Sequence, residues 1–225
     1  HKGIIANPNC STIIMVMALK PIYDLAKIKR VIVSTYQAVS GAGKEGIDEL
    51  DAQVREHSEG REMTANILPS ASAEKHYPIA FNLIPQIDVF CDNLYTKEEM
   101  KMVNETKKIM EDYEMRITAT TIRVPVYRSH SESVNIELEK EVDLGAMREA
   151  LAKFPGVTVQ DDPSKQEYPM PLYTSEKDDV YVGRLRRDES WEKSYNMWVV
   201  GDQIRKGAAL NTLQIAETMI KNGWI

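Results

Sequence analysis

Cys10, one of two cysteines in the chain, follows an Asn-Pro-Asn turn and precedes a run of apolar residues. Asn9 or Ser11 is a good N-cap, so a helix is predicted to begin within a residue of Cys10. The positive end of a helix favours thiolate over thiol, which predicts a reactive cysteine. The alternative is a small buried structural cysteine, and the local pattern favours neither interpretation.

His130 and Arg123 are the next candidates for chemistry. His130 lies in a serine-rich segment after a predicted strand, and a single cysteine with a distant histidine is typical of thiolate catalysis. From position alone, a surface turn histidine is the simpler interpretation. Arg123 lies in an otherwise apolar strand, where a buried guanidinium needs a partner. That partner is either a ligand carboxylate or an internal salt bridge.

Other polar positions give weaker signals. Glu98 and Lys101 lie three residues apart on one predicted helix face, which usually indicates a solvated ion pair. The short glycine loop at residues 40–43 permits close approach of a ligand to the backbone. No metal site is expected, because neither cysteine has a second ligand at zinc-finger spacing.

Composition excludes several classes. The chain has 225 residues, with 43% hydrophobic and 28% charged, as in an ordinary globular protein with a sizeable core. A net charge of −6 and no basic run argue against nucleic acid as a partner. Two distant cysteines favour a reducing compartment, and neither a membrane span nor a signal peptide is visible. We therefore expect a cytoplasmic protein that does not bind membranes.

Residue periodicity predicts alternating strands and helices. Strands are expected at residues 30–37, 115–127, 133–139, 156–160, 179–187 and 195–200, with a strand end at 4–6. Helices are expected at 11–19 (buried, ending before Pro21), 44–57, 97–111, 144–154 and 202–222. Thr96 and Glu99 form a capping box for the third helix, and Asp143 caps the fourth. This order predicts an α+β fold with a mixed, largely antiparallel sheet and helices on one face.

Several longer motifs together resemble aspartate-semialdehyde dehydrogenases, most closely the Gram-positive bacterial type. They are NPNCST around Cys10, VSTYQAVSGAG at 33–43, HYPIAFNLIPQID at 76–88, EEMKMVNETKKI at 98–109, IRVPVYRSHSES at 122–133 and KGAALNTLQIAE at 206–217. The resemblance covers essentially the whole chain. It implies the catalytic-domain fold of glyceraldehyde-3-phosphate dehydrogenase-like enzymes.

The resemblance also implies a role for individual residues. Cys10 matches the nucleophile that forms a thioester, His130 the acid/base, and Gln37 the residue that orients the substrate. The reaction is the reductive dephosphorylation of β-aspartyl phosphate to aspartate semialdehyde, and its reverse, in the biosynthesis of lysine, methionine and threonine.

Substrate and cofactor contacts are implied in the same way. Arg123 matches the residue that binds the substrate α-carboxylate and Glu98 the one that binds its amino group. Lys101 matches a phosphate contact, and Asn9 also belongs to the substrate site. The NADP contacts expected in this chain are Ser40, Gly41, Gly43 and Asn211.

One feature of the family is absent from the sequence, because no glycine-rich nucleotide-binding fingerprint occurs in the chain. We therefore expect a C-terminal catalytic and dimerisation domain at 1–201 and a helix at 202–225 that packs on a missing Rossmann domain. NADP binding is then incomplete, and a homodimer or a dimer of dimers is expected. The alternatives are a non-catalytic dimerisation fragment, an N-acetyl-glutamyl-phosphate reductase and, less well supported, a simple thiol hydrolase.

Overall fold

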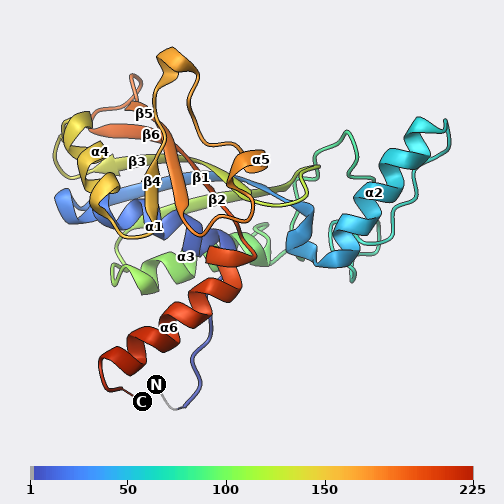
Figure 1. Ribbon diagram of the computed structural model, residues 1–225, viewed down its shortest axis with the longest axis horizontal. Coiled ribbons are helices and arrows are strands. Elements are labelled where there is room, and N and C mark those ends of the chain that lie inside the picture. Colours follow the sequence, from blue (N-terminus) through green and yellow to red (C-terminus); the bar gives the residue numbers. More distant parts are fainter. Residues whose placement is uncertain (1–2, 225) are drawn as a thin grey trace.

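The computed structural model describes residues 3–224 and is built around one six-stranded sheet in the order β2-β1-β3-β6-β5-β4 (Figure 1). The strands are β1 Ile28–Gln37, β2 Arg116–Arg123, β3 His130–Leu138, β4 Val157–Val159, β5 Val180–Arg187 and β6 Ser194–Gly201. The two outermost pairs, β1 with β2 and β4 with β5, are parallel, and the three central pairs are antiparallel. The predicted mixed, largely antiparallel sheet is confirmed.

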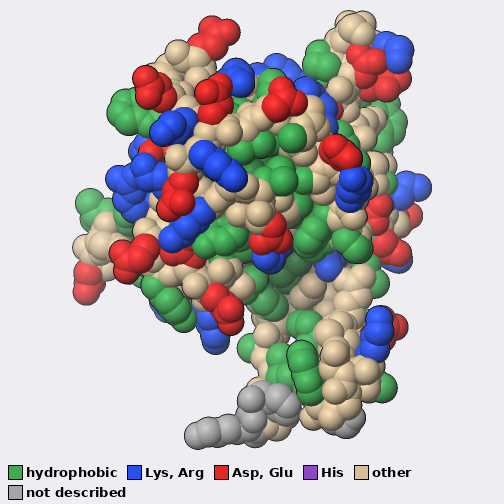
Figure 2. All heavy atoms as spheres, turned by 90° about the vertical axis from the view of Figure 1, so that its left-hand side faces the viewer, with side chains coloured by type: hydrophobic (Ala, Val, Ile, Leu, Met, Phe, Trp, Pro, Cys, Tyr) green, Lys and Arg blue, Asp and Glu red, His purple; other side chains and the backbone are tan. Residues whose placement is uncertain are grey.

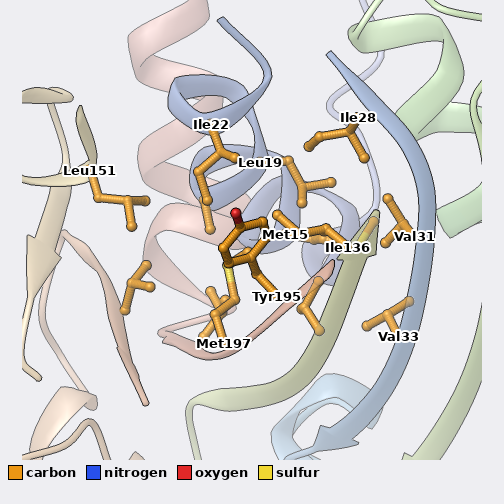
Figure 3. Packing of buried hydrophobic residues seen from close by; sticks show 14 of the residues in the cluster. Met15, Leu19, Ile22, Ile28, Val31, Val33, Ile136, Leu151, Tyr195 and Met197 are labelled. Carbon is orange, nitrogen blue, oxygen red and sulfur yellow. The ribbon is translucent and has the colours of Figure 1, made fainter. Parts of the chain in front are cut away.

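Three helices cover one face of this sheet: α1 Cys10–Leu25, α3 Lys97–Ile109 and α4 Leu144–Lys153 (Figure 1). The main core lies between them and the sheet (Figure 3). In that view Met15 and Leu19 of α1 point toward Ile136 of β3 and Tyr195 of β6. The Tyr195 hydroxyl donates to the Val142 carbonyl at 2.7 Å, so its polar atom is satisfied inside the core.

A separate arm carries α2 Lys44–Ser58 and the irregular chain after it (Figure 1). Its small hydrophobic cluster consists of Val39, Leu50, Leu68, Ile79, Ala80 and Ile84. The irregular chain after α2 has no helix or strand to pair its backbone groups, so side chains of α2 form hydrogen bonds with them. Gln53 accepts from the N–H groups of Ile79 and Ala80, at 2.8 and 3.0 Å.

The chain ends in a short π-helical turn, Arg205–Ala209, and α6 Leu210–Lys221. A single-turn helix, α5 Pro171–Thr174, and two 3-10 turns, Val39–Ala42 and Pro163–Lys165, complete the described elements. Helix α6 projects from the body of the molecule (Figure 1), and only Met219 among its residues is buried. Figure 2 shows hydrophobic side chains on this lower projection.

Two predictions about the first 25 residues are wrong. Helix α1 does not end before Pro21 but continues through it to Leu25. A proline inside a helix costs about 3 kcal/mol, but Leu19 and Ile22 on either side of it are fully buried. Each such burial is worth roughly 1.5–3 kcal/mol, which offsets the cost.

The predicted strand end at residues 4–6 is also absent. Ile4 is 86% exposed, and the segment runs beside α6 (Figure 1). A side-chain hydrogen bond from Asn211 Nδ2 to Asn7 Oδ1, 2.8 Å long, joins the two. A helix has no free backbone ladder with which a strand could pair.

Candidate active site

Cys10 is the first residue of α1. Asn9 is the N-cap, with its side-chain oxygen accepting from the Thr12 N–H at 3.1 Å. The π-helical turn packs against the cysteine so closely that a Cβ on Gly207 would lie 3.0 Å from Cys10 Cβ. The predicted helix corner at Cys10 is confirmed.

His130 is fully buried as the first residue of β3, paired with Gly201 of β6. The predicted turn position is therefore wrong, because strand pairing extends three residues further toward the N-terminus than the alternating pattern indicated. His130 Nε2 lies 3.5 Å from Cys10 Sγ, and Nδ1 accepts from the Ala38 backbone N–H at 3.0 Å. The structure thus brings the predicted cysteine and histidine together.

Gln37 and Glu98 complete this cluster from two other elements. Gln37 is the last residue of β1, and its Nε2 donates to Glu98 Oε1 at 3.1 Å and lies 3.5 Å from His130 Nε2. Glu98, in the first turn of α3, also accepts from Asn9 Nδ2 at 2.8 Å. The predicted capping box at the start of α3 is present and fixes the position of that turn. Lys101 Nζ lies 3.4 Å from Glu98 Oε2, so it borders the same carboxylate.

Arg123, the last residue of β2, is 3% exposed. Its Nη1 donates to the Ala38 carbonyl at 2.7 Å, whereas its Nε has no hydrogen-bond partner among residues 3–224. Within residues 3–224 no carboxylate forms an ion pair with it, and the Glu98 carboxylate pairs with Lys101 instead. A buried guanidinium without an anionic partner is suited to bind one from a ligand.

Burial dominates the electrostatics of these groups. It raises the pKa of the Cys10 thiol to about 12, and the Glu98 carboxylate adds to the rise. The Ser11 backbone N–H and Arg123 lower this pKa by smaller amounts. Burial and the charge of Arg123 together hold the pKa of His130 well below its usual range. Burial around Cys10 thus opposes the thiolate that the helix end favours, and the reactive thiolate stays a prediction.

The four residues expected to contact a cofactor fall into two places. Ser40 and Gly41 lie in the turn after β1, where Ser40 Oγ accepts from Gln203 Nε2 at 2.5 Å. Gly43, at the start of α2, has φ of 85° and open space on its Cβ side. Asn211 is located apart from them on α6, where its Oδ1 accepts from Lys206 Nζ at 3.2 Å.

Sequence reasoning missed three contributors to this region. The backbone of Ala38 contacts both His130 and Arg123, which no side-chain pattern can reveal. Gln203 joins the turn after β1 to the segment before β3, because its Oε1 accepts from Ser129 N–H at 2.8 Å. Glu132, two residues after His130 in β3, is fully buried and neither carboxylate oxygen has a partner among the described residues.

Two further properties concern residues 3–224 only. No helix in this part of the chain is long and apolar enough to cross a membrane. The same residues contain no group of three or more His, Cys, Asp or Glu side chains arranged to hold a metal ion.

The half-buried Cys10 and the fully buried His130 lie together at the edge of an α+β sheet, and this arrangement defines the class of domain to which the chain is similar. Residues 19–206 match the family "Semialdehyde dehydrogenase, dimerisation domain", and the chain belongs to this family. The aspartate-semialdehyde dehydrogenases of Aquifex aeolicus (strain VF5) and Bacillus subtilis (strain 168) are 55% and 52% identical to it. These alignments cover 100% and 98% of the chain but 64% of each relative.

Solved structures agree with this assignment. The chain superimposes on aspartate semialdehyde dehydrogenase II of Vibrio cholerae, solved in complex with ASA, with a TM-score of 0.91 and 46% identity. This match covers 97% of the chain and 62% of the Vibrio protein. The chain thus spans a little under two thirds of the proteins it resembles.

Proposed function

We propose that this chain is the catalytic and dimerisation part, residues 1–201 with a C-terminal segment at 202–225 that contains α6, of an NADP-dependent aspartate-semialdehyde dehydrogenase. Its reaction is the reductive dephosphorylation of β-aspartyl phosphate to aspartate semialdehyde, and the reverse, for lysine, methionine and threonine biosynthesis. The observation that carries the proposal is the 3.5 Å contact between Cys10 Sγ and His130 Nε2. Beside it lies the buried Arg123, whose Nε has no hydrogen-bond partner in the described part of the chain.

The charges around this contact suit an amino acid substrate. Arg123 binds the α-carboxylate, because a planar guanidinium matches a carboxylate with two parallel hydrogen bonds. Glu98 receives the ammonium group, with Asn9 holding one of its oxygens at 2.8 Å. Lys101 contacts the phosphate after exchanging its present partners, Asp88 and Glu98, at 3.3 and 3.4 Å.

In the thioester step, the Cys10 sulfur forms a bond to the acyl carbon, and the bond from that carbon to the phosphate oxygen breaks. Phosphate leaves with the electron pair, and Gln37 orients the acyl group beside the sulfur. His130 is the acid/base residue of the site, and in this step it acts at the substrate oxygen as a hydrogen-bond donor. NADP(H), when bound, supplies or accepts the hydride.

The residues of this chain that border NADP in the proposal are Ser40, Gly41, Gly43 and Asn211. Gly43 fits this role best, because its open Cβ side lets a ligand approach the backbone. The side chains of Ser40 and Asn211 already have protein partners, so they reach a ligand only through their remaining hydrogen-bonding capacity. These residues supply one border of a cofactor site, and the rest lies outside the chain.

The helix-free face of the sheet suits a homodimer contact. Tyr36 and Trp198 lie on this face, half-buried, with ring centroids 5.5 Å apart. In the proposal two copies pack through this face, singly or as a dimer of dimers. Sedimentation equilibrium tests it, and a monomer at all concentrations contradicts it.

Helix α6 suits a contact with the remainder of a longer protein. Leu213 and Ile220 are 62% and 64% exposed, which is unusual for large apolar residues on one short helix. The relatives extend beyond the matched region by about a third of their length. In the proposal α6 packs on the nucleotide-binding domain that this additional length forms.

Acyl transfer to Cys10 tests the function without a cofactor. The chain is mixed with β-aspartyl phosphate and quenched in acid, and the intact mass and the released phosphate are measured. We expect one aspartyl group on Cys10 in a Cys91→Ser background and none in Cys10→Ser. Arg123→Gln should slow the reaction about tenfold or more, the cost of losing a charged hydrogen bond. No acylation at millimolar substrate would leave a non-catalytic dimerisation fragment as the better interpretation.

The same assay separates the runner-up, N-acetyl-glutamyl-phosphate reductase. Its substrate has no ammonium group, so the Glu98 carboxylate would have nothing to bind. We expect Glu98→Gln to slow acylation by β-aspartyl phosphate, while N-acetyl-glutamyl phosphate acylates neither protein. Preferential acylation by the acetylated substrate would reverse the assignment.

A further inference from the structure

The peptide group of Ala38 contacts both buried functional side chains. Its N–H donates to His130 Nδ1 at 3.0 Å, and its carbonyl accepts from Arg123 Nη1 at 2.7 Å. Ala38 is fully buried directly after β1, with φ of −62° and ψ of 149°, an ordinary extended conformation. The contact is therefore part of an unstrained and water-excluded backbone.

This contact decides where the histidine carries its proton. A nitrogen that accepts a hydrogen bond from a backbone N–H has its lone pair free, so Nδ1 is unprotonated. A neutral imidazole has one proton, which must then be on Nε2. Nε2 is the atom that faces Cys10 Sγ at 3.5 Å.

The surroundings of Nε2 agree with this assignment. Gln37 Nε2 donates to the Glu98 carboxylate, and Thr35 Oγ1 donates to Gln37 Oε1 at 2.9 Å, so the amide orientation is determined from both ends. The amide thus presents N–H toward the imidazole, not an acceptor. Among the described residues, the Cys10 sulfur is the one acceptor recorded at Nε2.

We infer that the Ala38 N–H fixes His130 as the Nε2–H tautomer and makes it a hydrogen-bond donor to the Cys10 sulfur, not the acceptor of the thiol proton. For the reaction, which rests on the proposed function, the Nε2–H of His130 also stabilises the oxyanion that forms on the substrate beside the sulfur. When the thiolate attacks a carbonyl carbon, the C=O π electrons move onto oxygen, and Nε2–H donates to that oxyanion. The ring keeps its proton, and the thiol proton passes to water before the attack.

Because Gly41 has no side chain, it leaves room for the His130 and Arg123 side chains that contact Ala38. A Cβ at this position would lie 2.6 Å from Arg123 Nη1 and 3.2 Å from His130 Cε1. Its φ is not positive, so alanine fits the backbone and its only conflict is with these side chains. Gly41→Ala therefore displaces the Arg123 guanidinium from the Ala38 carbonyl and crowds the imidazole beside it, without straining the turn. Ala42→Gly, in the same turn, is the matched control.

Nitrogen NMR reads the tautomer directly and needs neither substrate nor cofactor. The chain is labelled with 15N-histidine, and the His130 signals are assigned among the four histidines by their loss in His130→Gln. From about pH 5 to 9 we expect one unprotonated Nδ1 and one protonated Nε2, since burial disfavours imidazolium. Gly41→Ala should move the signals toward a mixture of tautomers, and Ala42→Gly should not. A protonated Nδ1, or a doubly protonated ring at neutral pH, overturns the inference.

Cys10 alkylation by iodoacetamide supplies a second readout, in a Cys91→Ser background near pH 9. Glutamine places an N–H close to the histidine Nε2 position but cannot act as a base. If His130 acts as a donor, His130→Gln retains the rate within about threefold, and His130→Ala loses about tenfold or more, as for a hydrogen bond to a charged group. Equal loss in both variants means that His130 is the base. Failure of acylation by β-aspartyl phosphate would refute the proposed function and leave the tautomer result intact.

Discussion

Glu132 gives the sharpest test of how burial controls charge in this fold. It lies in β3 between Thr35 of β1 and Val199 of β6, and neither neighbour carries a charge. Both carboxylate oxygens are buried without a partner among the described residues. Burial alone raises the pKa of Glu132 well above its usual value, so the folded chain holds this carboxyl group neutral.

The sign of the effect on stability follows from proton linkage. The unfolded chain releases the Glu132 proton above an ordinary pKa of about 4.3, while the folded chain retains it. The stabilising contribution of this group is therefore complete below about pH 4 and is lost as pH rises toward the raised folded pKa. Within that window the free energy of unfolding falls by about 1.4 kcal/mol per pH unit, or about 2.7 kcal/mol over two units.

The perturbation is Glu132→Gln, which keeps the shape and removes the ionisation. Urea unfolding at pH 5, 6, 7 and 8 gives the free energy of unfolding of both proteins. We expect the variant to gain on the parent by up to about 1.4 kcal/mol per pH unit until the pH reaches the raised pKa of Glu132, and the gain to level off above it. Glu137→Gln is the matched control, in the same strand, but it removes a carboxylate that pairs with Lys29 at 3.1 Å. The free energy of unfolding of Glu137→Gln should not rise relative to that of the parent as the pH increases. A parallel pH dependence of parent and Glu132→Gln would refute the neutral carboxyl group.

Two further predictions concern the site and its support. With the pKa of Cys10 raised to about 12, its alkylation in a Cys91→Ser background should rise about tenfold per pH unit from pH 7 to 10. A plateau below pH 9 would contradict the burial argument, because it is the behaviour of a thiol near 8.5. Thr96→Ala removes the cap of α3, where Thr96 Oγ1 accepts from Glu99 N–H at 3.2 Å, and should cost about 1–2 kcal/mol in urea unfolding. Thr96→Ser should restore most of it, and an equal loss in both variants would exclude the cap as the cause.

The sequence predicted those elements whose signals are local. The capping box at Thr96 and the Asp143 cap mark the beginnings of α3 and α4, because each works through hydrogen bonds within a few residues. The continuation of α1 through Pro21 was not predictable, since it depends on what Ile22 packs against. The raised pKa of Cys10 was not predictable for the same reason, because desolvation depends on distant elements such as the turn at Gly207.

Sheet register explains why the site residues meet although they are far apart in sequence. Strands β1 and β2 are parallel, so their carboxyl ends coincide, and the register pairs Gln37 with Arg123. Strand β3 is antiparallel to β1, so its amino end, His130, arrives at the same edge. A slip of one residue in any of these strands would turn its functional side chain to the opposite face. The apolar residues Val33 and Val134, opposite each other on the helix-covered face, oppose such a slip. The core under α1 thus sets the geometry of the site, and substitutions there should change the chemistry as well as the stability.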